Sequence, residues 1–389
     1  MTRVLTYFLT IVAIQALFQQ AVAQLTLVNV GNTNIGAMLD LQVSGNYAFL
    51  ANGYAGMRIC DISNPTNPIS VGTVGSLGYP RALTISDSHV FLVGDGSLDI
   101  YDISNPTDPV SVASTNIGGY QNDVAVSGSY LYVPRSSLSI FDVSDPTYPL
   151  MTGNVIGGGS YSIVVSKDFA YVSNPNSGHT LFVYDVHNPY APTNVYASAG
   201  AYVWGLAISS NYLFAASQSF IPVSGGYVSG VLTFDISNPT NPVYAATTGD
   251  SISAGARLVA KNGFVYLIDY MRGLTIYDAS NPTNLVDVGN IMNSGSAWSV
   301  AVSGCYAYVG GTDGLHINAI IPRLEINLLA PDTLRLSWLA PAFFTVQQND
   351  SPSSTNWIAL TNTPSVFGTR AQFDIPRPTG NKFYRLVSR

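Results

Sequence analysis

Residues 61–65 read Asp61-Ile-Ser-Asn-Pro65, and close variants of this pentapeptide return five more times along the chain. The copies are separated by 41, 40, 43, 50 and 43 residues. Internal periods of this size are typical of solenoids and β-propellers. The repeat therefore decides the fold class, and its copies begin at Asp61, Asp102, Asp142, Asp185, Asp235 and Asp278.

Short alternating apolar runs surround each copy of the pentapeptide. In the first repeat they predict strands at residues 39–43, 47–51, 57–60 and 69–74. Four short strands in about 40 residues form the unit of a propeller blade. The pentapeptide therefore lies in the turn between the third and fourth strands.

The six aspartates have a structural explanation. Asp and Asn side chains accept hydrogen bonds from backbone groups two residues on, and Pro fixes φ while ending the strand ladder. We interpret the aspartates as turn residues, and not as a ring of metal ligands or catalytic acids. A residue that is identical in every blade is expected to have a structural role within each blade. Cys60 precedes the first aspartate, and an aromatic residue that we expect to pack between blades precedes the others: Tyr101, Phe141, Tyr184, Phe234 and Tyr277.

The two ends of the repeat region predict how the ring closes. A seventh repeat begins at Trp298 but stops at Ala319, where no turn motif follows. Residues 25–32 match residues 285–290, which form a fourth strand. We expect the N-terminal strand to complete the last blade of a seven-bladed, all-β propeller, since joining the ends pairs otherwise exposed strand edges. The alternative is an open array of six or seven units.

The repeat resembles the LVIVD repeat of bacterial surface and secreted proteins. Val43-Ser-Gly-Asn-Tyr-Ala-Phe49 and Gly56-Met-Arg-Ile-Cys-Asp-Ile-Ser-Asn-Pro65 carry the resemblance, which covers residues 25–319. It implies an extracytoplasmic propeller, and it brings no settled activity and no catalytic residues.

The first residues indicate export. Arg3 precedes an uncharged apolar run over residues 4–18, and Ala21-Val-Ala23 supplies a small-x-small cleavage site. We therefore expect a signal peptide at 1–23, the alternative being a buried N-terminal helix. No later apolar run is long enough to span a bilayer. The expected product is secreted or held at the cell surface, with a propeller at 24–322.

Residues 323–389 break the repeat and predict a small β-sandwich-like domain. Leu336-Ser-Trp338 and Gly380-Asn-Lys-Phe-Tyr-Arg-Leu386 resemble a module that closes many exported bacterial proteins, which implies a role in surface presentation. The alternative is a stabilising appendage docked on the propeller. Strands are expected at 324–329, 333–338, 343–348, 356–360, 371–375 and 382–387.

Composition excludes several function classes. Charged residues make up 10% of the chain, the net charge is −7, and Lys167, Lys261 and Lys382 are the only lysines, so no basic stripe is available for nucleic acid. Zinc-protease, nucleophile-elbow, P-loop and EF-hand motifs are absent. The sequence thus assigns no catalytic residue, no metal ligand and no cofactor. Cys60 and Cys305 are not a disulfide framework, although a bridge between them is one alternative.

Residues that differ between blades are better candidates for function, because structure alone favours repetition. Aligning the repeats places Leu39, Arg81, Asn122, Tyr161, Trp204, Ala256 and Trp298 in a first column at the channel mouth. The second column holds Asp40, Ala82, Asp123, Ser162, Gly205, Arg257 and Ser299. The predicted ligand site consists of Asp40, Arg81, Asn122, Asp123, Tyr161, Trp204, Arg257 and Trp298.

Loops joining second and third strands add further candidates at the mouth. The longest loop, 217–230, accounts for the 50-residue interval and could reach over the mouth, or it is an ordinary surface insertion. The other loop candidates are Tyr54, Asp95, Arg135, His179, Asp269, Tyr270, Arg272 and Asp313.

The mouth combines aromatic faces with paired polar groups, which suit sugars or peptide side chains. The leading hypothesis is a binding scaffold for an extracellular glycan or protein. One alternative is a polysaccharide-active enzyme with Asp40 and Asp123 as acid and base. Arg81, between them in blade order, is expected to neutralise these carboxylates. A structural surface-layer component is the other alternative.

Overall fold

The computed structural model describes residues 25–75, 78–156, 161–175, 179–199, 202–218, 229–292 and 296–388. The expected signal peptide lies outside these residues. Apart from one short 3-10 helix, η1 (Gly53–Ala55), the regular elements of the described chain are all β-strands. Among the residues described, no helix has the length and hydropathy needed to span a lipid bilayer. The fold is therefore all-β.

Six four-stranded antiparallel sheets follow the repeats in order, each built from four consecutive strands. The first-repeat strands expected at 47–51 and 69–74 are found at those residues. The sheets are β2 (Asp40–Ser44), β3 (Tyr47–Ala51), β4 (Met57–Asp61) and β5 (Ile69–Val74); β6 (Pro80–Ser86), β7 (His89–Gly94), β8 (Ser97–Asp102) and β9 (Val110–Asn116); β10 (Ala125–Ser127), β11 (Tyr130–Pro134), β12 (Ser137–Asp142) and β13 (Leu150–Ile156); β14 (Ile163–Ser166), β15 (Phe169–Ser173), β16 (His179–Asp185) and β17 (Thr193–Ala199); β18 (Val203–Ser209), β19 (Tyr212–Ser217), β20 (Gly230–Asp235) and β21 (Val243–Thr247); and β22 (Arg257–Lys261), β23 (Phe264–Asp269), β24 (Gly273–Asp278) and β25 (Val286–Ile291).

One further sheet combines both ends of the repeat region. It has the order β1-β28-β27-β26 and contains β26 (Ala297–Ser303), β27 (Tyr306–Gly311), β28 (Gly314–Pro322) and the N-terminal β1 (Leu25–Thr33). The antiparallel β1–β28 ladder runs from the pair Leu25 and Pro322 to the pair Thr33 and Leu315. At Gly31 the strand passes so close to the first repeat that a Cβ would clash with the carbonyl oxygen of Pro65.

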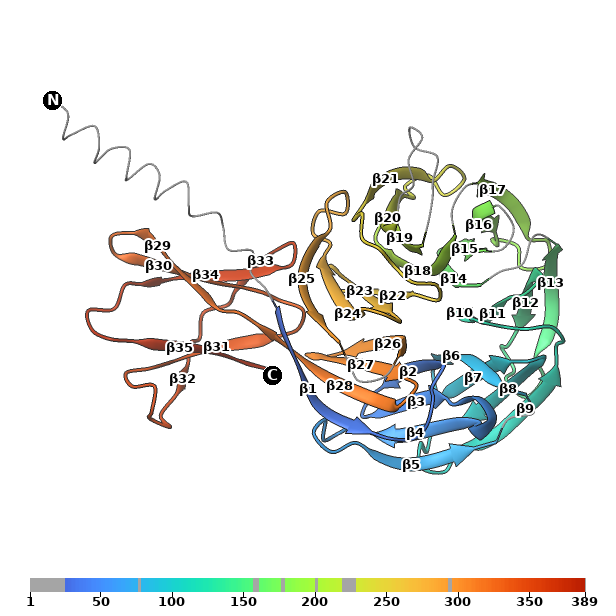
Figure 1. Cartoon of the computed structure of the whole chain (residues 1–389), viewed down its shortest axis with the longest axis horizontal. Helices are drawn as coiled ribbons and strands as arrows, with labels where there is room; N and C mark the ends of the chain where they lie inside the picture. The colour runs from blue at the N-terminus through green and yellow to red at the C-terminus, as the bar shows by residue number, and fades with distance from the viewer. Residues whose placement is uncertain are drawn as a thin grey trace.

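The sheets lie side by side around a common centre, with their first strands innermost (Figure 1). Each of these strands contacts that of the next sheet, and β26 contacts β2. The apolar core consists of clusters that each draw residues from two neighbouring sheets. The residue before each turn aspartate belongs to the cluster shared with the preceding sheet, as for Tyr101, Phe141 and Tyr184. The core therefore joins the sheets to one another.

Every turn aspartate accepts a backbone hydrogen bond from the residue two positions later. In the first repeat the N–H of Ser63 donates to Asp61 Oδ1 at 2.8 Å, and the other repeats have distances of 2.8 or 2.9 Å. The following Asn or Asp makes a second turn of the same kind, as Asn64 does with Thr66. These bonds fix the chain between the third and fourth strands.

The turns predict a specific response to acid. Hydrogen bonds from the serine two residues on hold the pKa values of Asp61, Asp102 and Asp235 below their ordinary value. Such a carboxylate contributes stability above its unfolded pKa, about 3.9, and loses it as the pH falls through the folded value. We expect the melting temperature of the wild type to decrease at pH values below about 4. The triple Asp→Asn variant at these positions should show a weaker dependence of melting temperature on pH.

Circular dichroism melting at a series of pH values measures this effect. The control is Asp108→Asn, which removes a nearby carboxylate without removing one of these turns. If the melting temperatures of the triple variant and the wild type fall equally steeply with pH, other titratable groups cause the acid sensitivity.

The C-terminal residues form two further sheets, β29-β30-β34-β33 and β32-β31-β35. The six strands expected from the sequence are found within two residues of their expected ends, whereas β33 was not expected. Both sheets contribute to one core around Leu336, Trp338 and Val346. The strands are β29 (Glu325–Ala330), β30 (Thr333–Leu339), β31 (Phe344–Asn349), β32 (Ile358–Ala359), β33 (Ser365–Phe367), β34 (Arg370–Pro376) and β35 (Phe383–Ser388).

The C-terminal sheets pack against the β22–β25 sheet. Leu339 joins the apolar cluster of the last two repeats, and the Asn262 side chain donates a hydrogen bond to the carbonyl oxygen of Pro341 at 2.9 Å. The two units are thus in direct contact beside β1 and β28 (Figure 1).

Cys60 and Cys305 are both free thiols, so the alternative of a bridge between them is wrong in this structure. Cys60 lies in the apolar cluster between the last and first repeats, and burial raises the pKa of its thiol to about 11. It packs as a small apolar residue.

Candidate functional site

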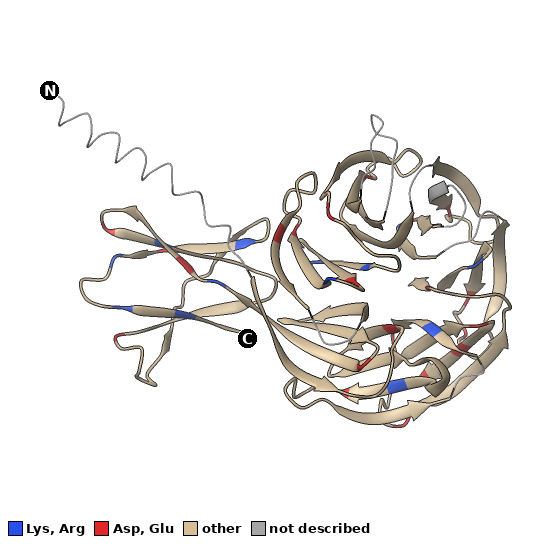
Figure 2. Ribbon diagram, viewed as in Figure 1, with Lys and Arg blue, Asp and Glu red and all other residues tan. Residues whose placement is uncertain are grey.

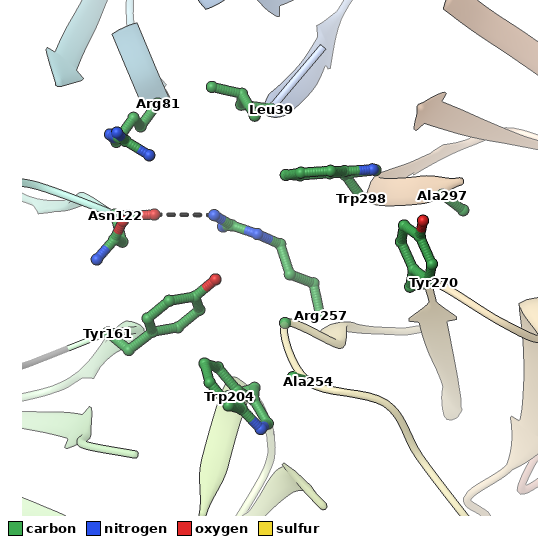
Figure 3. Close-up of a pocket in the computed structure, with 11 residues that line it drawn as sticks. Leu39, Arg81, Asn122, Tyr161, Trp204, Ala254, Arg257, Tyr270, Ala297 and Trp298 are labelled. Atoms are coloured by element: carbon green, nitrogen blue, oxygen red, sulfur yellow. Dashed lines mark hydrogen bonds between the residues drawn. The ribbon is translucent and has the colours of Figure 1, made fainter. Parts of the chain in front are cut away.

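A pocket of 260 Å³ lies at the centre of the sheets, at the end where the first strands begin (Figure 3). Six of the seven first-column residues line it: Leu39, Arg81, Asn122, Tyr161, Trp204 and Trp298. At the sixth repeat the pocket is lined by Ala254, Gly255 and Arg257, and not by the first-column residue Ala256. We call this the mouth pocket, and it brings the predicted first column together.

Second-column residues line a different cavity of 350 Å³. Asp40, Asp123, Ser162, Gly205 and Ser299 face this channel cavity. Arg257 lines both cavities, and Figure 3 shows its side chain extending across the mouth pocket toward Asn122. The predicted site is therefore divided into two levels, with Arg257 between them.

Arg257 is the cation that lies between the two central aspartates. Its Nη1 atom is 4.0 Å from Oδ1 of Asp40 and 4.0 Å from Oδ1 of Asp123, and its Nη2 donates to the carbonyl oxygen of Asn122 at 2.8 Å. The expectation that Arg81 neutralises these carboxylates is wrong. Arg81 instead pairs with Asp95, its Nε lying 2.7 Å from Oδ1.

Asp40 and Asp123 connect neighbouring sheets. The N–H of Leu83 donates to Asp40 Oδ2 at 3.0 Å, and the N–H of Ile163 donates to Asp123 Oδ2 at the same distance. The two acceptors stand at equivalent positions of the first and third repeats. Each carboxylate thus satisfies a backbone donor of the next sheet, which a buried N–H requires.

Serine hydroxyls complete the same network. Ser299 Oγ donates to Asp40 Oδ1 at 2.8 Å and accepts from the N–H of Leu41, while Ser162 Oγ donates to Asp123 Oδ2 at 2.8 Å. The N–H of Val124 donates to the remaining Asp123 oxygen, Oδ1, at 2.8 Å, so both oxygens of each carboxylate are occupied by internal donors. This arrangement positions strands and leaves little capacity for proton transfer to a substrate.

Burial and charge act in opposite directions on this network. Burial raises the pKa of Asp123, although Arg257 opposes the shift. Burial acts to lower the pKa of Arg257, but Asp40 and Asp123 together raise it above its ordinary value. The guanidinium therefore stays charged. The part of the chain that the structure describes holds no group of three or more His, Cys, Asp or Glu residues arranged to bind a metal ion.

Aromatic rings supply the surface of the mouth pocket. Tyr161 and Trp204 meet edge to face, with ring centroids 5.0 Å apart. Trp298 and Tyr270 are 39% and 51% exposed and stand on the other side of the pocket (Figure 3). Such faces bind flat apolar surfaces, while the neighbouring Asn122 offers polar atoms.

The loop candidates have separate positions. Tyr270 lines the mouth pocket, and Tyr54 is almost fully exposed. The buried Asp269 accepts hydrogen bonds from its own hairpin and from Ser253, so it holds a loop. The side chain of His179 and residues 219–228 of the longest loop lie outside the described residues. Arg135 binds the carbonyl oxygens of Ile117 and Gly118, Arg272 pairs with Asp250, and Asp313 pairs with His316.

Tyr79 and Tyr120 were missed at the sequence level. The guanidinium carbon of Arg81 lies 5.1 Å from the ring centroid of Tyr79 and 5.9 Å from that of Tyr120. Both tyrosines stand two residues before the first column, as Tyr202 does. The repeat alignment holds this signal, because a tyrosine recurs at one position in three repeats.

A family model described as the LVIVD repeat matches residues 35–75, 78–116, 118–156, 157–196, 255–293 and 294–317, more than half of the chain. It does not match the unit at 203–247, which contains the long loop but has the same strand order as the others. No curated protein matches the sequence significantly.

Two solved structures are similar in fold. The WD40 β-propeller domain of Doa1 has a TM-score of 0.55 and 11% identity, over 76% of this chain and 96% of that one. The computationally designed Ika8 protein has a TM-score of 0.52 and 11% identity, over 77% of this chain and all of that one. At this identity the likeness concerns the fold alone, which is propeller-like.

Proposed function

Because this chain belongs to the LVIVD repeat family, we propose that it is a seven-bladed β-propeller that acts outside the cell as a binding scaffold. The mouth pocket is its ligand site. One observation carries the proposal: the turn residues repeat, whereas the residues lining the mouth pocket differ from blade to blade. A varied, partly exposed aromatic surface on a repeating frame is typical of a binding site.

The contacts between sheets support a closed ring. The last repeat and the first share an apolar cluster around Met38, Leu41 and Leu315, as every other neighbouring pair of repeats shares one. Pairing of β1 with β28 supports closure by the N-terminal strand. An open array would leave these apolar faces exposed to water, which costs about 25 cal/mol for each Å².

The proposal includes bacterial export and two mature domains. Residues 1–23 act as the signal peptide, residues 24–322 form the propeller and residues 323–389 form a sandwich-like module for surface presentation. The sequence pattern of the first residues supports export. The C-terminal module's contact with the β22–β25 sheet gives it a second role in stabilising the ring.

A glycan or a protein suits the pocket better than a nucleic acid. Lys and Arg positions are sparse and scattered along the strands in Figure 2. Tyrosine and tryptophan provide large contact areas with few rotatable bonds, so ordering them on binding costs little entropy. The enzyme alternative has weaker support, because internal donors occupy the oxygens of Asp40 and Asp123.

Replacing Trp204 or Trp298 with alanine tests the mouth pocket as the ligand site. We expect each variant to bind the ligand at least about tenfold more weakly, since each ring covers one side of the pocket. Glycan arrays and pull-down from extracellular extracts identify the ligand, and titration calorimetry measures the change. Tyr148→Ala is the control, because Tyr148 is exposed and lies outside the pocket. The proposal is wrong if no ligand depends on either tryptophan.

A further inference from the structure

We propose that the ligand is a neutral polysaccharide chain, which extends from the mouth pocket across a strip formed by Tyr54, Tyr79, Arg81 and Tyr120. This inference rests on the proposed function and names the substrate class of the same site. The strip comes from the first three repeats. It joins the mouth pocket at Arg81, which lines that pocket as well.

The strip is continuous. The rings of Tyr54 and Tyr79 meet edge to face, with centroids 4.6 Å apart. The guanidinium carbon of Arg81 is 5.1 Å from the Tyr79 centroid and 5.9 Å from that of Tyr120. Successive contacts thus link four planar side chains from three repeats, although the rings of Tyr54 and Tyr79 are inclined by 75° to each other. A row of this kind matches a chain of linked rings better than a single small ligand.

The strip is exposed and also held in place. Tyr54 is 96% exposed and Tyr120 is 70% exposed, although aromatic side chains normally bury much of their area. Tyr79 packs on the backbone of Gly53, where an added Cβ would lie 2.7 Å from its ring. Asp95 fixes the guanidinium of Arg81. A prearranged surface loses little entropy on binding, so its exposed area is available to a ligand.

The charges at this site favour an uncharged ligand. Among the described residues, the charged ones that line the mouth pocket are Arg81 and Arg257, and each already has a carboxylate partner. An anionic chain would have to compete with Asp95 for Arg81, and would lie near the carboxylates below Arg257. A neutral sugar ring neither competes with Asp95 for Arg81 nor is repelled by the carboxylates near Arg257. Its C–H face packs on an aromatic ring while its hydroxyls bind polar groups such as the Asn122 amide.

Chain length gives a direct test, because a disaccharide can fill only part of the pocket and strip. The probes are disaccharides and hexasaccharides of glucan, xylan and mannan, with polygalacturonate as the acidic probe, titrated into the full mature protein. We expect a neutral hexasaccharide to bind at least about tenfold more tightly than its disaccharide, with no loss in about 0.5 M NaCl.

Variants of the strip locate the extra contacts. Tyr54→Ala and Tyr120→Ala should each weaken hexasaccharide binding about 3- to 10-fold, the effect of one aromatic contact, and weaken disaccharide binding less. Tyr148→Ala is the matched control, since Tyr148 is an exposed tyrosine at an outer turn. Far-ultraviolet circular dichroism verifies that each variant is folded.

Several results would overturn the inference. They are salt-sensitive binding of polygalacturonate alone, equal affinity for short and long chains, unchanged hexasaccharide binding in both strip variants, or no bound glycan at all. If a protein or disaccharide is still bound in a Trp204-dependent manner, only the polysaccharide inference fails. If no ligand of any kind depends on Trp204 or Trp298, the proposed function fails with it.

Discussion

Replacing Arg257 with methionine is expected to destabilise the protein by about 3–5 kcal/mol, because it leaves two buried carboxylates without their cation. The side chains of Arg257, Asp40 and Asp123 are 19%, 12% and 16% exposed. Methionine preserves most of the side-chain volume, so the decrease in the free energy of unfolding is due mainly to the missing positive charge. Urea unfolding followed by tryptophan fluorescence measures it.

The pH dependence of this loss has a definite sign. Without Arg257, burial raises the folded-state pKa of Asp123 further above the unfolded value of about 3.9, because the guanidinium that opposes this shift is gone. The folded variant then binds more protons than the unfolded chain, so its stability relative to the wild type recovers as the pH falls from 7 toward about 4. If the difference in unfolding free energy between the variant and the wild type does not change with pH, lost packing and not lost charge causes the destabilisation.

Two further variants serve as controls. Arg81→Met removes a pair in which both side chains are 33% exposed, so it should cost only about 0–1 kcal/mol. Adding Asp40→Asn and Asp123→Asn to Arg257→Met removes the uncompensated charges and should restore much of the lost stability. Failure of this rescue would contradict the assignment of Arg257 as the counter-ion.

A cross-link between β1 and β28 is expected to form and to stabilise the protein strongly. Asn29 and Asn318 are Cα partners in the ladder, and their side chains are 3.4 Å apart, Nδ2 to Oδ1. In a Cys305→Ser background, Asn29→Cys with Asn318→Cys should oxidise readily. In the chain-entropy picture, closing so long a loop adds about 5 kcal/mol, measured by urea unfolding of the oxidised and reduced forms.

Register provides the matched control. Val28 pairs with Ala319 and stands one residue away, on the opposite face of the strand. Val28→Cys with Asn318→Cys should therefore remain reduced under the same conditions. Equal cross-linking of both pairs, or of neither, would contradict the pairing of the N-terminal strand with β28.

The repeat made much of this fold predictable. Because each unit is nearly the same in sequence and in space, aligning six copies of one turn located the strands, the inter-sheet aromatic residues and the first column at the mouth. The turn bonds of Asp61 and its equivalents follow from local chemistry, since a short polar side chain reaches only the next few backbone groups.

The site was less predictable because its contacts cross the centre between the sheets. Arg257 meets Asp40 and Asp123 across a centre where side-chain direction, and not blade order, decides the partners. Blade order suggested Arg81, but Asp95 on the neighbouring hairpin holds that side chain outside the channel. Equivalent positions in the repeats predict which residues lie at the same depth along the first strands. They do not predict how far a long side chain such as Arg257 extends.

The pairing of β1 with β28 also has consequences for how the molecule matures. Asn29 pairs with a residue 289 positions later, so β1 stays unpaired until every other strand of the repeats has been synthesised. Such non-local pairing is slow to form. Until it forms, the free strand of one molecule fits the empty position in another equally well, and exchange of this kind joins molecules head to tail. Intramolecular pairing of β1 with β28 therefore competes with strand exchange between molecules, and a low protein concentration favours the intramolecular pairing.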